Sequence, residues 1–385
     1  MGIHRITCHF CSMQDYFGLS GENLFDSVHY DSNNVIKAHY FGERRLCPRG
    51  NFCVELAQHK QRVGYSLIDN EFVKGREALD TVANSLDTVD KSKIAILLSG
   101  SLTLEEAFLA GKLANKWGTK FVSQISPEDE IVAGFMNNFS FASLPQMQVI
   151  ISVGDIFSLH PTMAKFIHDA RFAERNNFLT TVDNCSSRTS RYAWCNLKAS
   201  PGKVADLMEA LAKAVSGEEY SIDNTGVDKD SFQQLVSTLR DTTNACVLFA
   251  PGVGRFSEPL RVGFWAKKLA EARKFQFSAF ATGANGKGIS RLLNTFDFVS
   301  TNEVISAIRS GDVEALLALG CDPIESFPGL YDHFKNIKFI ATTATLPTAI
   351  VEIADVVIPS YHLFEKSGTI LSLVEKLTQL DDPFP

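Results

Sequence analysis

The 385-residue sequence has no dense run of lysine or arginine and no apolar segment of 18 residues. Its formal net charge of −7 and its pI near 5.8 argue against nucleic-acid binding, because phosphate recognition needs a concentrated basic surface. The N-terminal stretch MGIHRITCHF also lacks the apolar core of a secretory leader. We therefore expect no nucleic-acid partner, no membrane insertion and a cytoplasmic location.

Cysteine is scarce and unevenly distributed. Eight cysteines in 385 residues are too few for a disulfide scaffold. Four lie near the N-terminus, Cys8, Cys11, Cys47 and Cys53, and the other four are spread singly and are expected to be small buried residues. In a chain without a leader, the C-x-x-C pair of Cys8 and Cys11 indicates a metal or redox site rather than a structural bridge.

Apolar runs of strand length alternate with amphipathic stretches from about residue 75 onward. Examples are IAILLSG (94–100), QVIISVGD (148–155), FLTTVD (178–183) and VLFAPGVG (247–254). Such an alternation is typical of parallel sheets covered by helices on both faces. Residues 1–60 are instead rich in turn formers, and the polar stretch 216–231 interrupts the later pattern.

The predicted fold class is therefore α/β, in three parts. Residues 1–60 form a small β-rich domain that carries the cysteines, residues 61–230 a first doubly wound α/β domain, and residues 231–385 a second one. Ligands of such sheets bind beyond the carboxyl ends of the strands. The residues that directly follow the apolar runs are consequently the candidates for ligand binding.

Several of these strand ends carry glycine, aspartate or asparagine, which let a backbone approach a ligand closely and offer groups to a phosphate or ribose. The bland alternative is that such residues simply terminate strands. PGVGRF (251–256) lacks the third glycine of a G-x-G-x-x-G motif, so an ordinary NAD site is weakly supported. The predicted cofactor-binding residues are Gly154, Asp183, Gly252, Gly254, Asn285, Gly320 and Asp322.

The cysteines allow three kinds of site. An iron–sulfur cluster needs converging thiolates, and Cys8, Cys11 and Cys47 supply three. Asp15 or Cys53 could complete the set, so the predicted metal ligands are Cys8, Cys11, Asp15 and Cys47, with a possible 4Fe-4S cluster. A zinc site is disfavoured because the spacing from Cys47 to Cys53 is wide for a zinc knuckle, and an empty remnant of a site is the third alternative.

Two motifs at opposite ends of the chain resemble one known family. C-x-x-C followed by Asp15 and then C-P-R-G is similar to the N-terminal cluster domain of the molybdopterin oxidoreductase superfamily. ADVVIPSYHLFEKSGT resembles the C-terminal signature of that superfamily, on Asp355, Pro359, Glu365, Gly368 and Thr369. GDIFSLHP (154–161) and GCDPIESFP (320–328) look most like the superfamily's member in formylmethanofuran dehydrogenase and its counterpart in the bacterial formyltransferase/hydrolase complex.

The resemblance also shows departures. Active members bind tungsten or molybdenum through a cysteine or selenocysteine in a segment that corresponds to residues 121–138, which contains no cysteine. Ser126 or Asp129 could ligate a metal through oxygen, as in other branches. Arg49 stands where many active members carry a lysine between cluster and pterin. From these departures we expect that tungsten and molybdopterin are absent, and the resemblance to the shorter branch implies that the pterin-binding barrel is not on this chain.

Three functions remain open from the sequence. The first is a silent scaffold subunit of a formyltransferase/hydrolase complex in one-carbon metabolism, with formyltransferase and hydrolase subunits as partners. The second is an active tungsten or molybdenum subunit that interconverts carbon dioxide and formate. The third is an electron-transfer subunit like the large iron–sulfur subunit of complex I.

Overall fold

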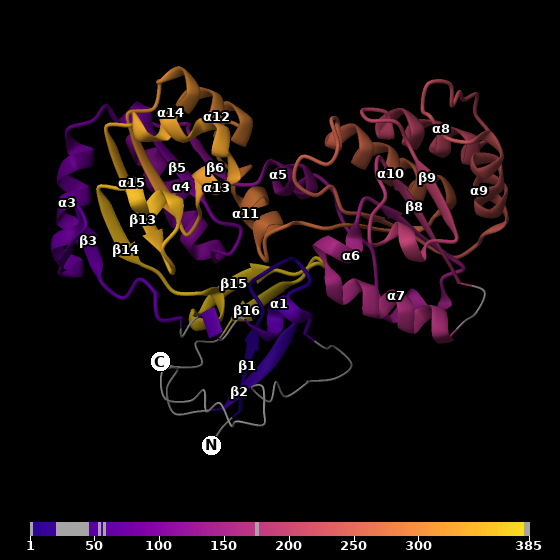
Figure 1. Cartoon of the computed structure of the whole chain (residues 1–385), viewed down its shortest axis with the longest axis horizontal. Coiled ribbons are helices and arrows are strands. Elements are labelled where there is room, and N and C mark those ends of the chain that lie inside the picture. The colour runs from indigo at the N-terminus through magenta and orange to yellow at the C-terminus, as the bar shows by residue number, and fades with distance from the viewer. Residues whose placement is uncertain (1–2, 21–45, 53–54, 57–58, 174–176, 381–385) are drawn as a thin grey trace.

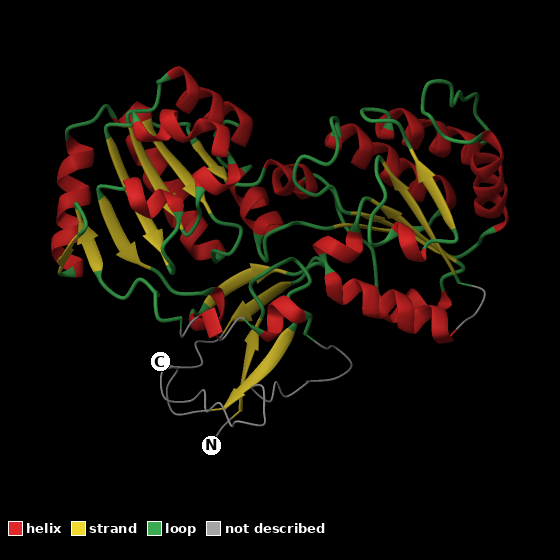
Figure 2. Ribbon diagram, viewed as in Figure 1, coloured by secondary structure: helices red, strands yellow, loops and turns green. Residues whose placement is uncertain are grey.

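Two sheets flanked by helices make up most of the molecule, in a computed structural model that describes residues 3–20, 46–52, 55–56, 59–173 and 177–380. The two α/β units lie side by side, and the cysteine-bearing segment with a C-terminal hairpin lies below and between them (Figure 1). Helices cover the sheets of both units (Figure 2). The α/β fold class with mostly parallel sheets is thereby confirmed.

The larger sheet has seven strands in the order β4-β3-β14-β13-β12-β5-β6. The strands from β14 to β6 pair in parallel, whereas β3 pairs antiparallel both with β14 and with β4 at the edge. The strands are β3 (Ser66–Ile68), β4 (Glu71–Val73), β5 (Ile94–Leu98), β6 (Val122–Gln124), β12 (Ala315–Leu319), β13 (Phe339–Ala344) and β14 (Val356–Pro359). The accompanying helices are α3 (Gly75–Asp87), α4 (Leu104–Trp117), α11 (Gly286–Leu293), α12 (Thr301–Ser310), α13 (Pro323–Ser326), α14 (Tyr331–Lys335) and α15 (Ala349–Ile353).

The smaller sheet has five strands, all parallel, in the order β11-β10-β7-β8-β9. They are β7 (Val149–Val153), β8 (Phe178–Asp183), β9 (Cys195–Lys198), β10 (Ala245–Phe249) and β11 (Gln276–Ala279). The helices of this unit are α6 (Ile156–Leu159), α7 (Pro161–Ala173), α8 (Val204–Ser216), α9 (Lys229–Asp241) and α10 (Pro259–Arg273), while α5 (Pro127–Ala133) lies between the two units, against α11 and α10.

Two antiparallel hairpins complete the described structure. β1 (Ile3–Thr7) pairs with β2 (Tyr16–Ser20) on either side of the cysteine loop, which is followed later in the chain by α1 (Pro48–Asn51). β15 (Gly368–Leu371) pairs with β16 (Leu377–Leu380) near the C-terminus. No helix in the described part of the chain has the length and apolar content needed to cross a bilayer.

The central strands form because their apolar runs are buried on both faces. Every residue of β5, β7 and β10 is buried, and each fully buried aliphatic side chain contributes about 1.5–3 kcal/mol to folding. Capping residues in the sequence determine where the connecting helices begin and end. Thr103 and Ser300 begin α4 and α12 with capping boxes, and Gly118 and Gly311 end these helices in left-handed conformations.

Strand pairing crosses the middle of the chain. β10 and β11, which follow residue 230, pair with β7 and with each other, while β12 to β14 return to the sheet that contains β5. The polar stretch 216–231 joins α8 to α9, which contact each other within the five-stranded unit. The sheets thus interleave along the chain, and the domain ranges predicted from the sequence stay a prediction about folding units.

This interleaving creates one reversal of strand order in each sheet. In the larger sheet the order reverses between β5 and β12, and in the smaller sheet between β7 and β10. Neighbouring connections leave in opposite directions at such a point, so a crevice opens beyond the carboxyl ends of the two strands. These two crevices are the places to examine for ligand-binding groups.

Candidate functional site

The reversal point of the larger sheet opens into a cavity of about 240 Å³. Segments that follow β5, β12, β13 and β14 line it, together with His9 from the cysteine loop. The polar and basic lining residues are His9, Ser99, Ser101, Thr345, Ser360, Tyr361, His362 and Lys366. Of the predicted cofactor-binding residues, Gly320 lies on this wall.

Two histidines give the cavity a neutral aromatic wall. The ring centroids of His9 and His362 lie 5.0 Å apart, and His362 stacks on Phe364 at 5.3 Å. Burial, helped by the neighbouring His362, lowers the pKa of His9 to about 3, and burial also lowers the pKa of His362. Neutral imidazoles beside serine hydroxyls suit a polar, uncharged part of a ligand better than a cationic one.

Gly320 and Asp322 follow β12 but have different roles. Gly320 adopts a φ of 66°, and its N–H donates to the carbonyl and hydroxyl oxygens of Thr343 at 3.0 and 2.8 Å. The Asp322 carboxylate instead accepts from the N–H groups of Ile324 and Glu325 and begins α13. Asp322 is therefore engaged as a helix cap, whereas Gly320 faces the cavity.

The reversal point of the smaller sheet is closed by close backbone contact. Gly154 has a φ of 93°, and a Cβ atom on it would lie 2.2 Å from the carbonyl oxygen of Ala250. Gly252, with a φ of 62°, faces Leu159, while Gly254 has open space around it. The glycines predicted here for ligand approach thus allow, at Gly154 and Gly252, packing of the chain on itself.

Asp183, at the end of β8, is fully buried and paired with Arg255. The Nε–H of Arg255 donates to both carboxylate oxygens at 2.9 and 3.1 Å, and its Nη2 donates to Oδ2. The structure also records a contact of 3.3 Å from this Nη2 to the sulfur of Cys185. This carboxylate, one of the predicted cofactor-binding groups, therefore holds a guanidinium from the same chain.

Asn285 begins α11, between the loop after β5 and the C-terminal hairpin. It is buried, its Nδ2 donates to the carbonyl of Leu102 at 2.8 Å, and its Oδ1 accepts from the N–H of Leu371 at 2.9 Å. Its own N–H donates to the carbonyl of Gly100. All of these hydrogen bonds are internal, so Asn285 joins the start of α11 to the loop after β5 and to strand β15.

The cysteine loop forms a tight turn under the two units. The N–H of Cys8 donates to the carbonyl of Asp15 at 2.7 Å, and both Cys8 and Cys11 are buried. Burial raises the pKa of the Cys11 thiol to about 12. Cys47 begins α1, and the sulfur of Cys8 lies near Gly50 of that helix.

Asp15 is buried in the same loop, and its Oδ2 accepts from the hydroxyl of Thr162 at 2.6 Å. Within the described ranges, no three histidine, cysteine, aspartate or glutamate side chains are placed to hold a metal ion. Cys53 lies outside the described residues. The ligand set of Cys8, Cys11, Asp15 and Cys47 therefore stays a prediction.

Arg49 connects the cysteine segment to the smaller sheet. Its Nη2 donates to the carbonyl of Leu159 at 2.7 Å, in the segment before α7. Burial, together with the charge of Arg49, lowers the pKa of His160 to about 3. The cation that the family resemblance places between cluster and pterin thus contacts the strand-end segment GDIFSLHP.

Segment 121–138 uses its oxygens internally. Asp129 is fully buried, and its carboxylate accepts from the N–H and hydroxyl of Thr282 at 2.6 and 2.8 Å and from the N–H of Gly283 at 3.0 Å. The hydroxyl of Ser126 caps α5. Burial raises the pKa of Asp129 to about 6 although these donors oppose the shift. With its oxygens filled by Thr282 and Gly283, Asp129 does not fit a metal ligand in this arrangement.

The C-terminal signature also has a structural explanation. Glu365 forms a bidentate ion pair with Arg62 at 2.7 and 2.9 Å, and both side chains are largely buried. Thr369 donates its N–H and hydroxyl to Glu105 of α4. Gly368 is required because a Cβ atom there would lie 2.7 Å from the side chain of Thr103. The signature thus docks the C-terminal hairpin beside the cavity.

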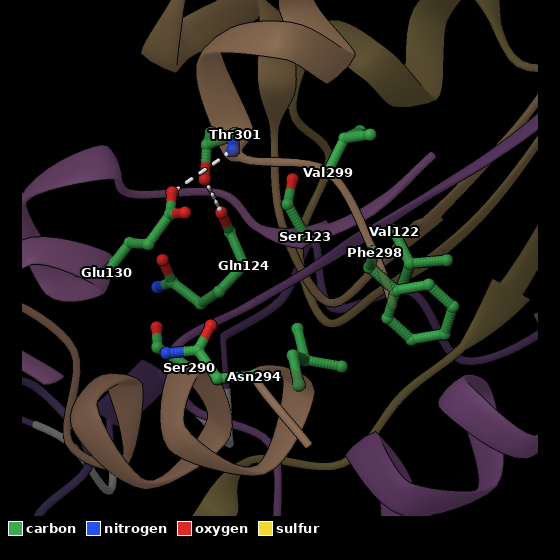
Figure 3. A pocket seen from close by; sticks show the side chains of 10 residues that line it. Val122, Ser123, Gln124, Glu130, Ser290, Asn294, Phe298, Val299 and Thr301 are labelled. Carbon is green, nitrogen blue, oxygen red and sulfur yellow. Dashed lines mark hydrogen bonds between the residues drawn. The ribbon is translucent and has the colours of Figure 1, made fainter. Parts of the chain in front are cut away.

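A second, small cavity of about 30 Å³ lies between β6, α11 and the start of α12 (Figure 3). Ser123 and Ser290 contribute hydroxyl groups to its lining, and Thr301 donates its N–H to Glu130 at 3.1 Å nearby. A cavity of this size accommodates one water molecule.

We expect one ordered water in this small cavity, bound by the two serine hydroxyls. Ser290→Ala should change the free energy of unfolding by less than about 1 kcal/mol, because the Ser123 hydroxyl and the other polar side chains of the lining, Gln124 and Asn294, remain to hold the water. A crystal structure at high resolution would show the water. A dry cavity would contradict the expectation.

Sequence reasoning missed the residues that shape both crevices. His9, His362 and Lys366 line the larger cavity although none follows the strand-end pattern of small polar residues. Within PGVGRF, only the two glycines were predicted to bind a ligand, and Arg255 was not. A basic residue directly after a glycine-rich strand end was the available signal, but its partner Asp183 lies 72 positions away.

Comparisons with known proteins show what the chain is similar to. The family model described as molybdopterin oxidoreductase matches residues 69–381. The F420-dependent formate dehydrogenase 2 subunit alpha of Methanococcus maripaludis is 26% identical, over 90% of this chain and 63% of its own length. The assimilatory nitrate reductase catalytic subunit of Bacillus subtilis is 26% identical, over 55% of this chain and 32% of its own. The chain thus spans less than two thirds of these relatives.

Two solved structures share the fold. Acetylene hydratase from Pelobacter acetylenicus superposes with a TM-score of 0.76 at 14% identity, covering 98% of this chain and 66% of its own. A chain of the formyltransferase/hydrolase complex from Methylorubrum extorquens, solved with methylofuran, gives 0.59 at 15% identity, covering 83% and 94%. At these identities the likeness shows the fold alone.

Proposed function

Because this chain belongs to the molybdopterin oxidoreductase family, we propose that it is a scaffold subunit of a formyltransferase/hydrolase-type complex without a tungsten or molybdenum redox site. The proposal depends on one observation, that segment 121–138 offers neither a cysteine nor a free Asp129 carboxylate to bind such a metal. The family resemblance places the metal-binding cysteine there, this chain has none, and Asp129 is committed to Thr282 and Gly283.

Two short motifs in the sequence support the choice of complex. GDIFSLHP and GCDPIESFP resemble the family member found in the formyltransferase/hydrolase complex. The superposition on that complex also extends over 94% of the matched chain. In such a complex the formyl group is transferred and released as formate by hydrolysis, so no electron has to pass through this subunit. The proposed partners are the formyltransferase and hydrolase subunits.

The proposal leaves defined tasks for the residues present. The chain offers a cavity at the β5/β12 reversal that could hold part of a pterin nucleotide, bordered by His9, Ser101 and Gly320. A bound cluster would use the predicted ligands Cys8, Cys11, Asp15 and Cys47, of which the first three are buried in the cysteine loop. Neither group is needed for formyl transfer or hydrolysis by partner subunits.

Metal analysis of the complex tests the proposal. The native complex, purified anaerobically with its partners, is expected to contain neither tungsten nor molybdenum that copurifies with this chain. Tungsten or molybdenum near one per chain, together with iron, would overturn the scaffold assignment in favour of the redox function. Iron alone would instead favour the electron-transfer function.

A cysteine variant gives an independent prediction. Cys8→Ala with Cys11→Ala should leave the rate of formate release by the intact complex unchanged. The free energy of unfolding should fall by about 1–2 kcal/mol, because two buried sulfur atoms are removed. Cys195→Ala is the matched control, since Cys195 is as buried as Cys11 but lies in β9, within a core cluster that contains no residue of the loop. Loss of formate release in the double variant but not in the control would show that the loop takes part in the reaction.

A further inference from the structure

The two reversal-point crevices differ in what fills them. Beyond β5 and β12 the chain leaves a cavity of about 240 Å³. Beyond β7 and β10, the backbone of Gly154 touches that of Ala250, and the Arg255 side chain reaches the end of β8 to pair with Asp183. In the second crevice, therefore, the buried Asp183 carboxylate is bound by an arginine of the same chain.

The chemistry of this pair resembles base recognition. The Arg255 guanidinium presents adjacent N–H groups, on Nε and Nη2, to the two oxygens of Asp183. A 2-amino-4-oxopyrimidine ring, as in guanine and pterins, carries the same fork of a ring N–H beside an exocyclic amine. A carboxylate binds either fork through two parallel hydrogen bonds.

The loop that carries Arg255 is held in place from several sides. The Nδ2 of Asn184 donates to the carbonyl of Arg255 at 2.7 Å, and the N–H of Gly254 donates to Glu128 at 2.9 Å. The Asp183 side chain is fully buried, while that of Arg255 retains 20% exposure. The guanidinium therefore lies between the buried carboxylate and the solvent, where an entering ring would have to pass.

We propose that Arg255 is a built-in occupant of a base-binding site, and that its guanidinium takes the place of a 2-amino-4-oxopyrimidine ring at Asp183. A pterin nucleotide of the kind that the family implies does not fit this crevice while the pair is formed. The crevice accepts such a ring only when the Arg255 side chain is displaced or removed. This inference concerns binding and stands independently of the scaffold role.

Thermal unfolding of the full chain tests the proposal. Arg255→Ala leaves the Asp183 charge buried without its partner, so its Tm should fall. GMP or neopterin, added at about ten times its Kd, should raise the Tm of this variant by about 2 °C, and AMP, which lacks the fork, should not. A response to GMP alone or to neopterin alone identifies which ring the site takes.

The double variant Arg255→Ala with Asp183→Asn is the matched control. It removes the carboxylate, so any shift that it keeps reports binding at the other crevice and is subtracted. Where Arg255→Ala is not recovered folded, Arg255→Gln, which keeps one donor for Asp183, gives the same readout.

Two results would overturn the proposal. One is that low-millimolar guanidinium raises the Tm of Arg255→Ala whereas GMP and neopterin leave it unchanged. The Asp183–Arg255 pair would then be a structural ion pair only. The other is a GMP and neopterin response of equal size in the single and double variants.

Discussion

Gly154→Ala is expected to destabilise the protein by about 4 kcal/mol or more, because two costs combine at this position. The residue adopts a φ of 93°, which residues other than glycine rarely adopt. The Cβ atom of an alanine there would lie 2.2 Å from the backbone oxygen of Ala250. A backbone atom cannot rotate away, so β7 and β10 would have to separate at their carboxyl ends. Chemical denaturation followed by circular dichroism measures the loss.

Gly254→Ala is the matched control for this prediction. Gly254 also has a positive φ, of 61°, but no atom lies within 4 Å of its Cβ position. Its substitution should therefore cost only the conformational penalty of about 1 kcal/mol. Equal losses in the two variants would show that the contact between Gly154 and Ala250 does not hold the crevice closed.

Asp129→Ala is expected to lower the free energy of unfolding by about 4 kcal/mol. The substitution removes the acceptor for the N–H groups of Thr282 and Gly283 and leaves a cavity where the carboxylate lay. These bonds connect α5 to the loop before α11, so the junction between the two units should loosen. Hydrogen exchange over residues 282–286 would localise the effect.

Asp322→Ala provides a control of the same chemical change. Asp322 also follows a strand and accepts two backbone N–H groups, but it caps a short helix and is only half-buried. The loss of such a cap costs about 1 kcal/mol. If Asp322→Ala destabilised the protein as much as Asp129→Ala, the buried junction would not be the source of the larger effect.

The pKa of Asp129 gives the first variant a pH signature. Its folded-state pKa of about 6 lies above the ordinary value of 3.8, so the ionised carboxylate costs stability above pH 6. This cost is relieved as the pH falls through 6, because the folded protein takes up the proton first. Between pH 7 and pH 5, the parent should therefore gain about 1 kcal/mol relative to Asp129→Ala.

Buried histidines act in the opposite direction and cancel in that comparison. The pKa of His160 is lowered to about 3, so the unfolded chain takes up a proton on acidification before the folded protein does. Both proteins should lose stability from this source as the pH falls below 6.5. Parallel pH profiles for parent and variant would contradict the role assigned to Asp129.

The elements of the sheets were largely accessible from the sequence, but their pairing was not. Runs such as IAILLSG and QVIISVGD are buried strands, as their uninterrupted apolar character predicted. That β10 pairs with β7, and β12 with β5, depends on which buried surfaces fit each other across 96 to 221 positions. The order of residues along the chain places strands but carries no information on such distant partners.

The strand-end residues illustrate the same limit for the site. Their polarity correctly marked the crevice ends of the strands, and Gly320 does border the larger cavity. Yet Asp183 meets Arg255, and Asn285 meets Leu102 and Leu371, so their hydrogen-bonding groups are used within the chain. Whether a polar residue faces a ligand or another loop depends on what folds against it.

The sequence by itself determined the α/β class, the family through its two terminal motifs, and the absence of a cysteine from segment 121–138. Each of these depends on local residue order, since apolar runs set strands and motif spacing sets ancestry. Only the tertiary structure decided that one crevice stays open and that the other is filled by Arg255. That outcome requires two segments 72 positions apart to meet at a fully buried carboxylate, because an unpaired charge there would be too costly to keep.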